Sequence, residues 1–84
     1  YLNNVGYDFL YHKQVKTALE VFKLALLADP ENANLYDSLG EAYYRAKDYK
    51  TSKENFEKSL EIDPDNANAK KYIQDINQIL AANT

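Results

Sequence analysis

The sequence contains no cysteine, methionine or tryptophan, only two glycines and two prolines, and a single histidine, His12. The lack of cysteine excludes disulfides and thiolate metal sites, although it does not indicate a redox compartment. One histidine cannot supply a metal-ligand cluster or a catalytic triad. Asp37, Ser38 and Glu41 lie close together in sequence, but no base, oxyanion site or glycine-rich turn accompanies them. We therefore expect a segment that is not an enzyme and that needs no cofactor and no metal.

Charge of one sign is not concentrated in any part of the chain, and long apolar runs are missing. The 10 basic and 13 acidic residues give a formal net charge of −3 and are mixed along the sequence. Nucleic-acid binding normally needs a basic face, and the eight tyrosines do not replace one, because several occupy predicted core positions. No apolar run reaches the length of a transmembrane helix, and no signal peptide is evident. We expect neither a nucleic-acid nor a membrane partner, and the cellular location stays open.

The sequence does contain an internal repeat with a period of 34 residues. Residues 1–34 and 35–68 are identical at 12 aligned positions. A period of about 20–50 residues is typical of stacked repeat architectures, whose units usually present a binding surface rather than a reaction centre. The identical positions, numbered in the first copy, are Gly6, Lys13, Lys16, Thr17, Glu20, Phe22, Leu26, Asp29, Pro30, Asn32, Ala33 and Asn34.

Apolar residues recur at alternating spacings of three and four, and this pattern predicts five amphipathic helices. Asp29-Pro30 and Asp63-Pro64 should end the second and fourth helices, because a residue before proline avoids helical backbone angles. The predicted N-caps are Asn32, Asp48 and Asn66. A glycine inside a helix costs about 1 kcal/mol relative to alanine. Gly6 and Gly40 are therefore expected where a partner helix approaches closely, beside Phe22 and Phe56 respectively.

The order Tyr36, Leu39-Gly40, Tyr43, Ser52, Phe56, Pro64, repeated as Leu2, Val5-Gly6, Phe9, Ala18, Phe22, Pro30, resembles the tetratricopeptide repeat family. The resemblance implies an all-α, right-handed α-solenoid of five helices in a single domain, residues 1–84. Repeat 1 covers about 1–32, repeat 2 about 33–66, and a capping helix about 67–82. Ser52 departs from the family's preferred alanine. Lys13 and Lys47 stand where many members have glycine, so we expect slightly strained helix ends there.

In this family, the first helix of each hairpin lines a concave groove that holds a peptide or a partner helix. The resemblance therefore implies a protein-protein interaction module. Residue by residue, the aligned groove positions are Asn3, Tyr7, Leu10 and Tyr11, then Asn34, Asp37, Glu41, Tyr44 and Arg45, and finally Asn68, Lys71, Asp75 and Gln78. The alternative is that these side chains form an ordinary solvated polar face.

Chaperone-binding members of the family clamp a C-terminal carboxylate with lysine, asparagine and arginine at set positions. The aligned positions in this chain are Asn3, Tyr7, Ser38, Asn68 and Tyr72. None of them is a cation, so we do not expect a chaperone-tail adaptor.

A second candidate surface lies on the outer side of the second predicted helix. Leu24 and Leu27 point away from its buried stripe, whereas the equivalent residues of the fourth helix are Lys58 and Glu61. A helix that is apolar nearly all round is usually covered on both sides. The alternative function is therefore a structural or oligomerisation appendage, which packs this face on an attached catalytic domain or on a second copy. Scattered exposed leucines are the plainer interpretation.

Two short phrases, residues 21–24 and 33–43, are similar to C-terminal repeat modules of bacterial proteins that follow a serine-hydrolase or β-lactamase-like domain. This resemblance implies a bacterial origin and a C-terminal module within a longer chain. None of the catalytic residues of such an enzyme lies in this segment. The partner, the native compartment and the complete domain architecture stay open.

Overall fold

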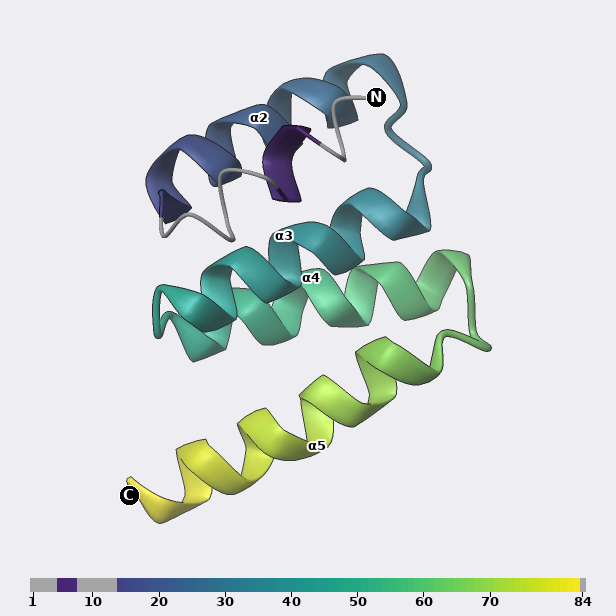
Figure 1. Cartoon of the computed structure of the whole chain (residues 1–84). Helices are drawn as coiled ribbons and strands as arrows, with labels where there is room; N and C mark the ends of the chain where they lie inside the picture. Colours follow the sequence, from purple (N-terminus) through teal and green to yellow (C-terminus); the bar gives the residue numbers. More distant parts are fainter. Residues whose placement is uncertain (1–4, 8–13, 84) are drawn as a thin grey trace.

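The computed structural model describes residues 5–7 and 14–83, and these residues form helices joined by short connections (Figure 1). The helices are α2 (Val15–Ala28), α3 (Ala33–Arg45), α4 (Tyr49–Ile62) and α5 (Ala67–Ala82). Residues 5–7 are also helical, and the described residues contain no strand. The all-α helical-repeat fold predicted from the sequence is thus confirmed. The predicted positions Asn3, Leu10, Tyr11 and Lys13 lie outside the described residues.

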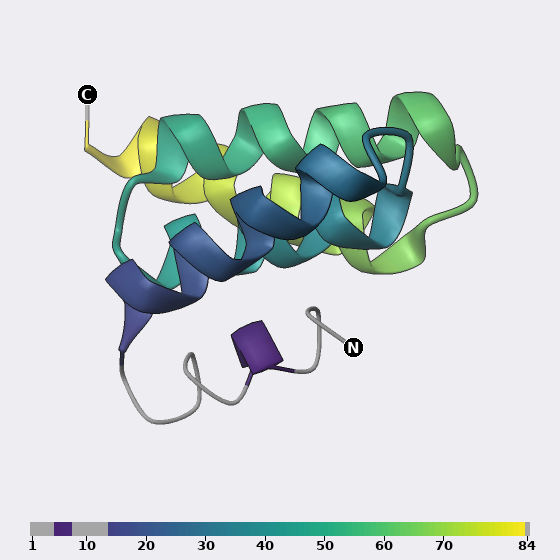
Figure 2. The same cartoon turned by 90° about the horizontal axis from the view of Figure 1, so that it is seen from above.

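The helices form two layers. Residues 5–7, α3 and α5 make up the first-helix layer, and α2 and α4 make up the second-helix layer. α2 packs on α3, α3 on α4, and α5 on both α3 and α4. Seen from above, residues 5–7 and α4 lie on opposite sides of the stack (Figure 2). This arrangement leaves one face of the first-helix layer without a covering helix from the described chain.

The helix ends lie where the sequence predicts them. α2 ends at Ala28 and α4 at Ile62, each one residue before an Asp-Pro pair. All three predicted N-caps are confirmed, since each side chain accepts a backbone N–H of the first turn and so satisfies a donor with no partner inside the helix. The bonds are Asn32 to Asn34 N (2.9 Å), Asp48 to Thr51 N (3.3 Å) and Asn66 to Ala69 N (3.2 Å).

The mid-helix glycines lie at the closest approach of paired helices, as predicted. A Cβ atom added to Gly40 would meet two ring carbons of Phe56 at 2.7 Å, and one added to Gly6 would meet the Phe22 ring. Both phenyl rings are fully buried. The Ser52 hydroxyl donates to the Gly40 carbonyl at 2.6 Å, which gives a physical reason for serine where the family pattern prefers alanine.

The turn between α3 and α4 contains the expected strained helix end. Lys47 has a φ of 65°, in the left-handed region that favours glycine. The backbone N–H groups of Lys47 and Asp48 donate to the carbonyls of Tyr44 and Tyr43, each at 3.0 Å. These bonds satisfy carbonyls at the end of α3 and hold the residue in its costly conformation.

α5 has one buried side and one polar side. Its Ala69 and Ile76 are fully buried and share a core cluster with Phe56. On its other side Gln74, the residue aligned with Gly40, is exposed, as are Lys70, Asn77 and Gln78.

Candidate functional site

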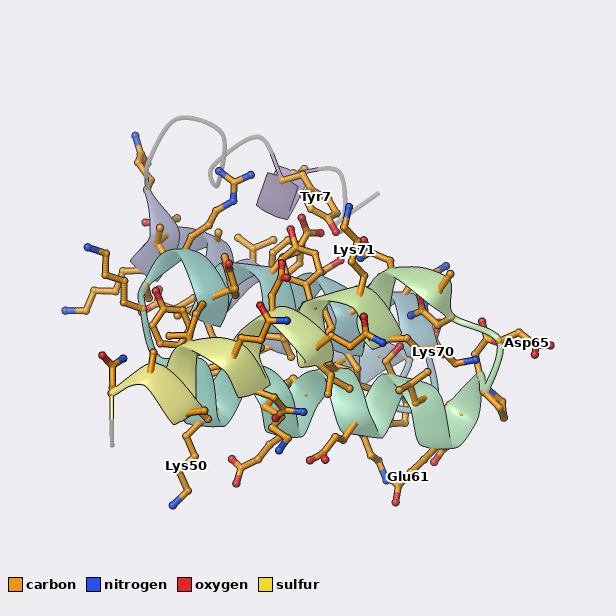
Figure 3. The ribbon with its side chains drawn as sticks, turned by 90° about the horizontal axis from the view of Figure 1, so that it is seen from below. Tyr7, Lys50, Glu61, Asp65, Lys70 and Lys71 are labelled. Carbon is orange, nitrogen blue, oxygen red and sulfur yellow. The ribbon has the colours of Figure 1, made fainter. Side chains whose placement is uncertain are left out.

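The candidate site lies on the uncovered side of the first-helix layer. Its side chains recur every three or four residues, so they share one face of each helix. Tyr7 and Lys71 lie at one edge of the molecule, while Lys50 and Glu61 of α4 lie at the opposite edge (Figure 3). We call this surface the first-helix face. Its described members are Tyr7, Asn34, Asp37, Ser38, Glu41, Tyr44, Arg45, Asn68, Lys71, Tyr72 and Asp75.

At the centre of this face, the Glu41 carboxylate joins all three rows of the first-helix layer. Its Oε2 accepts a hydrogen bond from the Tyr7 hydroxyl at 2.7 Å. Its Oε1 accepts one from the Tyr72 hydroxyl at 3.2 Å. The buried Ser38 hydroxyl shares its proton between the Tyr7 hydroxyl (3.1 Å) and the Asn34 carbonyl (2.8 Å). We call Tyr7, Ser38, Glu41 and Tyr72 the Glu41 network.

A second link joins α3 to α5 on the same face. The Asn68 side-chain amide donates to both carboxylate oxygens of Asp37, at 3.0 and 3.1 Å. Three contacts on this face join residues that are 31 apart in sequence: Asn68 with Asp37, Tyr72 with Glu41, and Ser38 with Tyr7. Tyr7 and Glu41, by contrast, are 34 residues apart, which is the repeat period. A residue of one first helix can therefore contact both the equivalent position of the next first helix and the position three residues before it.

Burial and the Glu41 charge shape the electrostatics of this face. Burial raises the pKa of Tyr7 well above its ordinary value, and the Ser38 hydrogen bond opposes this effect. Burial also raises the pKa of Tyr72 to about 12. The nearby Glu41 charge adds to that increase, and Arg45 opposes it by less. Both phenols therefore remain protonated hydrogen-bond donors at neutral pH.

The pKa of the Asp37 carboxyl is also raised. Burial raises its pKa, the hydrogen bond from Asn68 opposes the increase, and the negative charge of Glu41 adds to it. Asp37 and Glu41 are one helical turn apart, where like charges repel. Both carboxylates accept hydrogen bonds from neutral hydroxyl or amide groups. These neutral donors thus help to hold the negative charge on the face.

Beside the Glu41 network lies a pocket of about 260 Å³, whose lining comes from α3 and α5. The ring of Tyr44 meets that of Tyr72 edge to face, with centroids 5.0 Å apart. Small-molecule sites usually span about 300–1,000 Å³, so this pocket is the size for one side chain of a longer ligand. The lining residues are Tyr44, Asn68, Lys71, Tyr72 and Asp75.

The structure brings most of the described, sequence-predicted positions together. Tyr7 and Glu41 meet in the network, Asp37 meets Asn68, and the pocket lining includes Tyr44, Asn68, Lys71 and Asp75. Asn34, Arg45 and Gln78 are exposed on α3 and α5 and do not line the pocket.

Two residues of the site were absent from the predicted set, Ser38 and Tyr72. The available signal was their spacing. They occupy the same position in successive units, and each lies three residues before an acidic member of the face, Glu41 or Asp75.

Other chemistries find no support in the part of the chain that the structure describes. Within residues 5–7 and 14–83, no group of three or more His, Asp or Glu side chains could hold a metal ion. No helix among the described residues is both long and apolar enough to cross a bilayer.

The outer face of α2 differs from that of α4 as expected. Leu24 is 57% exposed and Leu27 is 82% exposed, the largest values among the exposed large hydrophobic side chains of the described chain. At the equivalent positions of α4, Lys58 and Glu61 form an ion pair at 3.4 Å. One repeat therefore carries two leucines where the other carries a solvated ion pair.

Comparison with known proteins supports the fold and a tetratricopeptide-like repeat at residues 33–66. Residues 33–66, which include α3 and α4, match the tetratricopeptide repeat family model. No curated protein matches the sequence significantly. The bacterial serine-hydrolase context therefore remains a prediction.

Several solved tetratricopeptide domains match 95–96% of the chain. The first domain of Spaghetti (RPAP3), bound to the HSP90 peptide SRMEEVD, has a TM-score of 0.90 at 24% identity over 95% of this chain and 64% of its own. The first domain of human RPAP3 gives 0.92 at 23% identity over 96% of this chain and 64% of its own. The Sgt2 domain of Aspergillus fumigatus gives 0.88 at 26% identity over 96% of this chain and 55% of its own. The chain thus spans less than two thirds of these structures.

Proposed function

We propose that this chain is a protein-interaction module that binds an extended peptide segment of a partner on the first-helix face. The observation that carries the proposal is the pocket beside the Glu41 network. It is walled by Tyr44 of α3 and Tyr72 of α5, and its other lining residues are the polar α5 side chains Asn68, Lys71 and Asp75. Tyrosine walls contribute apolar area together with hydroxyl groups that can hydrogen-bond a peptide. A related fold, the first domain of Spaghetti (RPAP3), has been solved with a bound peptide.

The test is a screen of capped heptapeptides against labelled protein, read by two-dimensional amide NMR. Binding should shift the amides of Tyr44, Tyr72 and their neighbours on α3 and α5. Lys71→Ala and Asp75→Ala should weaken binding of any hit, because both residues line the pocket. Both side chains are exposed, so their loss should leave the fold intact.

Matched controls are Lys70→Ala and Gln74→Ala. Each is the chain neighbour of a pocket residue and is exposed on the same helix, but neither lines the pocket. Lys70 and Lys71 extend in different directions from α5 (Figure 3). Equal weakening by the pocket variants and the control variants would contradict the proposal, as would a library in which no peptide shifts the first-helix face.

The chaperone tail is not our expected ligand, although a structural neighbour holds one. Three of the aligned clamp positions in this chain, Tyr7, Ser38 and Tyr72, belong to the Glu41 network, and a fourth, Asn68, bonds to Asp37. These positions supply no positive charge for a C-terminal carboxylate. We expect the peptide SRMEEVD to bind this chain weakly, if it binds at all.

A second candidate function rests on Leu24 and Leu27, because their exposure is unmatched at the equivalent positions of α4. In this alternative, the outer face of α2 packs on an attached domain or on a second copy of the chain. The double variant Leu24→Lys with Leu27→Glu would place on α2 the ion pair that α4 already carries. Sedimentation should then show a dimer dissociating into monomers. A chain that is monomeric before and after the change would exclude self-association through this face.

A further inference from the structure

The charges around the pocket decide which peptide would fit it, and three carboxylates dominate. Asp75 lines the pocket directly. Glu41 and Asp37 lie immediately behind the lining, since each accepts a hydrogen bond from a lining residue, Tyr72 and Asn68 respectively. Asp37 and Glu41 are half-buried, where charges act through a lower effective dielectric than at the surface. Two half-buried carboxylates therefore lie directly behind the pocket wall.

Two cations also lie at the pocket, Lys71 in its lining and Arg45 near Tyr72. Lys71 and Arg45 are both exposed, so solvent screens them more strongly than it screens the half-buried carboxylates. At the Tyr72 hydroxyl, which belongs to the pocket wall, the charge of Glu41 has a larger effect on the pKa than that of Arg45. The same Glu41 charge also raises the pKa of Asp37. The less exposed of the charges around the pocket, those of Asp37 and Glu41, are therefore negative.

The tyrosine walls of the pocket suit a lysine or arginine side chain. Lysine and arginine carry a long apolar stem and a charged head, and they can place the stem along apolar surface while the head stays polar. The Tyr44 and Tyr72 rings, 5.0 Å apart edge to face, provide that surface, and aromatic faces also attract cations. Each carboxylate oxygen can accept more than one hydrogen bond, so Glu41 can bind a cationic head while it holds the two phenols.

From these contacts we infer that the first-helix face selects a cationic peptide segment, with one lysine or arginine side chain in the pocket against the carboxylates of Glu41, Asp37 and Asp75. This inference rests on the proposed peptide-binding function and names its ligand class. It also predicts discrimination against acidic tails, because a like charge at the carboxylates is repelled. The overall charge of −3 should assist the approach of a positive segment at low salt.

The experiment compares capped heptapeptides that differ only in a central pair of residues, lysine, glutamate or the neutral glutamine, together with the acidic peptide SRMEEVD. Affinity is measured by titration, and the contact region by amide NMR. We expect the lysine peptide to bind about 10-fold more tightly than the glutamine peptide, and the glutamate peptide and SRMEEVD to bind least. Raising the salt from about 0.01 M to about 0.15 M should remove most of this preference, because the Debye length falls from ~30 Å to ~8 Å.

Charge-neutral variants assign the effect to the site. Asp75→Asn keeps the shape of an exposed side chain, and Glu41→Gln removes the central charge; both should reduce the preference for lysine several-fold. Glu57 is an exposed residue of α4, in the second-helix layer. Glu57→Gln removes one negative charge away from the first-helix face and should leave the preference for lysine unchanged. If Glu41→Gln unfolds the chain, Asp75→Asn alone carries the test.

The outcomes separate this inference from the function on which it rests. In one outcome, the amides of Tyr44 and Tyr72 shift, but the glutamate peptide or SRMEEVD binds as tightly as the lysine peptide. This outcome would overturn the selection for positive charge and leave the proposed peptide-binding face intact. A lysine preference unaffected by Asp75→Asn would overturn the placement of the cation in this pocket. If no peptide of the series shifts an amide signal on the first-helix face, both the charge selection and the proposed peptide-binding function are overturned.

Discussion

Replacing Gly40 by alanine tests the helix packing on which every surface assignment depends. In an exposed helix this change stabilises a protein by about 1 kcal/mol, because glycine is the weaker helix former. At Gly40, however, the added Cβ would lie 2.7 Å from ring carbons of Phe56, whereas ordinary contacts begin near 3.4 Å. The ring is fully buried and stacks on Tyr72 with centroids 4.8 Å apart, so it has no free direction in which to move.

The expected magnitude follows from these two opposing effects. Overpacking a well-filled core typically costs about 1–3 kcal/mol, which exceeds the gain in helix propensity. We therefore expect Gly40→Ala to lower the free energy of unfolding by roughly 1 kcal/mol, with a fall in melting temperature of about 4–8 °C for a domain of this size. Urea and thermal unfolding measure both quantities. The shifted Phe56 ring should also change the amide signals around Tyr72.

A double-mutant cycle isolates the contact responsible. With Phe56→Leu as background, the ring carbons nearest the new methyl group are gone, so Gly40→Ala should become neutral or stabilising. As a control, Asn77→Ala on the exposed side of α5 should stabilise by about 0.5 kcal/mol. The reasoning is refuted if Gly40→Ala stabilises the unmodified chain by the helix-propensity amount, or if Phe56→Leu does not alter its effect.

The parts of the fold that sequence reasoning predicted correctly are those with local determinants. Helix ends follow from Asp-Pro pairs and from asparagine or aspartate caps, whose partners lie two or three residues away. Gly40 and Phe56 are 16 residues apart, within one hairpin, and so are Gly6 and Phe22. Such features are repeated in both units, so the 34-residue period reveals them directly.

The contacts within the candidate site were harder to predict, for a geometric reason. The family resemblance put Glu41 and Asp37 among the groove positions, and their spacing of four places them on one face of α3. Helical spacing does not give the offset between neighbouring first helices, which depends on how the hairpins rotate and slide as they pack. Tyr72 with Glu41 and Asn68 with Asp37 are 31 residues apart, whereas Tyr7 with Glu41 is 34 residues apart, the repeat period. Alignment by the repeat period alone would have paired Glu41 with Tyr7 correctly and with Asp75 in place of Tyr72.

Three further predictions concern single side chains. Lys47→Gly should stabilise the chain by roughly 0.5–1 kcal/mol in urea unfolding, because glycine adopts the observed φ of 65° without strain; a loss of stability would contradict this account of the turn. Asn66→Ala should destabilise by about 1–2 kcal/mol, since it removes the α5 cap and the 2.9 Å bond to buried Ser59; an unchanged unfolding midpoint would show that the cap is dispensable. The last prediction concerns alkaline stability. Burial, with Glu41 adding to it, raises the pKa of Tyr72 from 10.0 to about 12, so the folded chain holds this proton more tightly than the unfolded chain does. The stability linked to this proton is intact below pH 10 and is lost as the pH rises through that window toward 12. Tyr72→Phe cannot ionise, so its free energy of unfolding should fall less steeply over this range in a series of urea titrations. Parallel curves for the two proteins would mean that the phenol has the same pKa in both states.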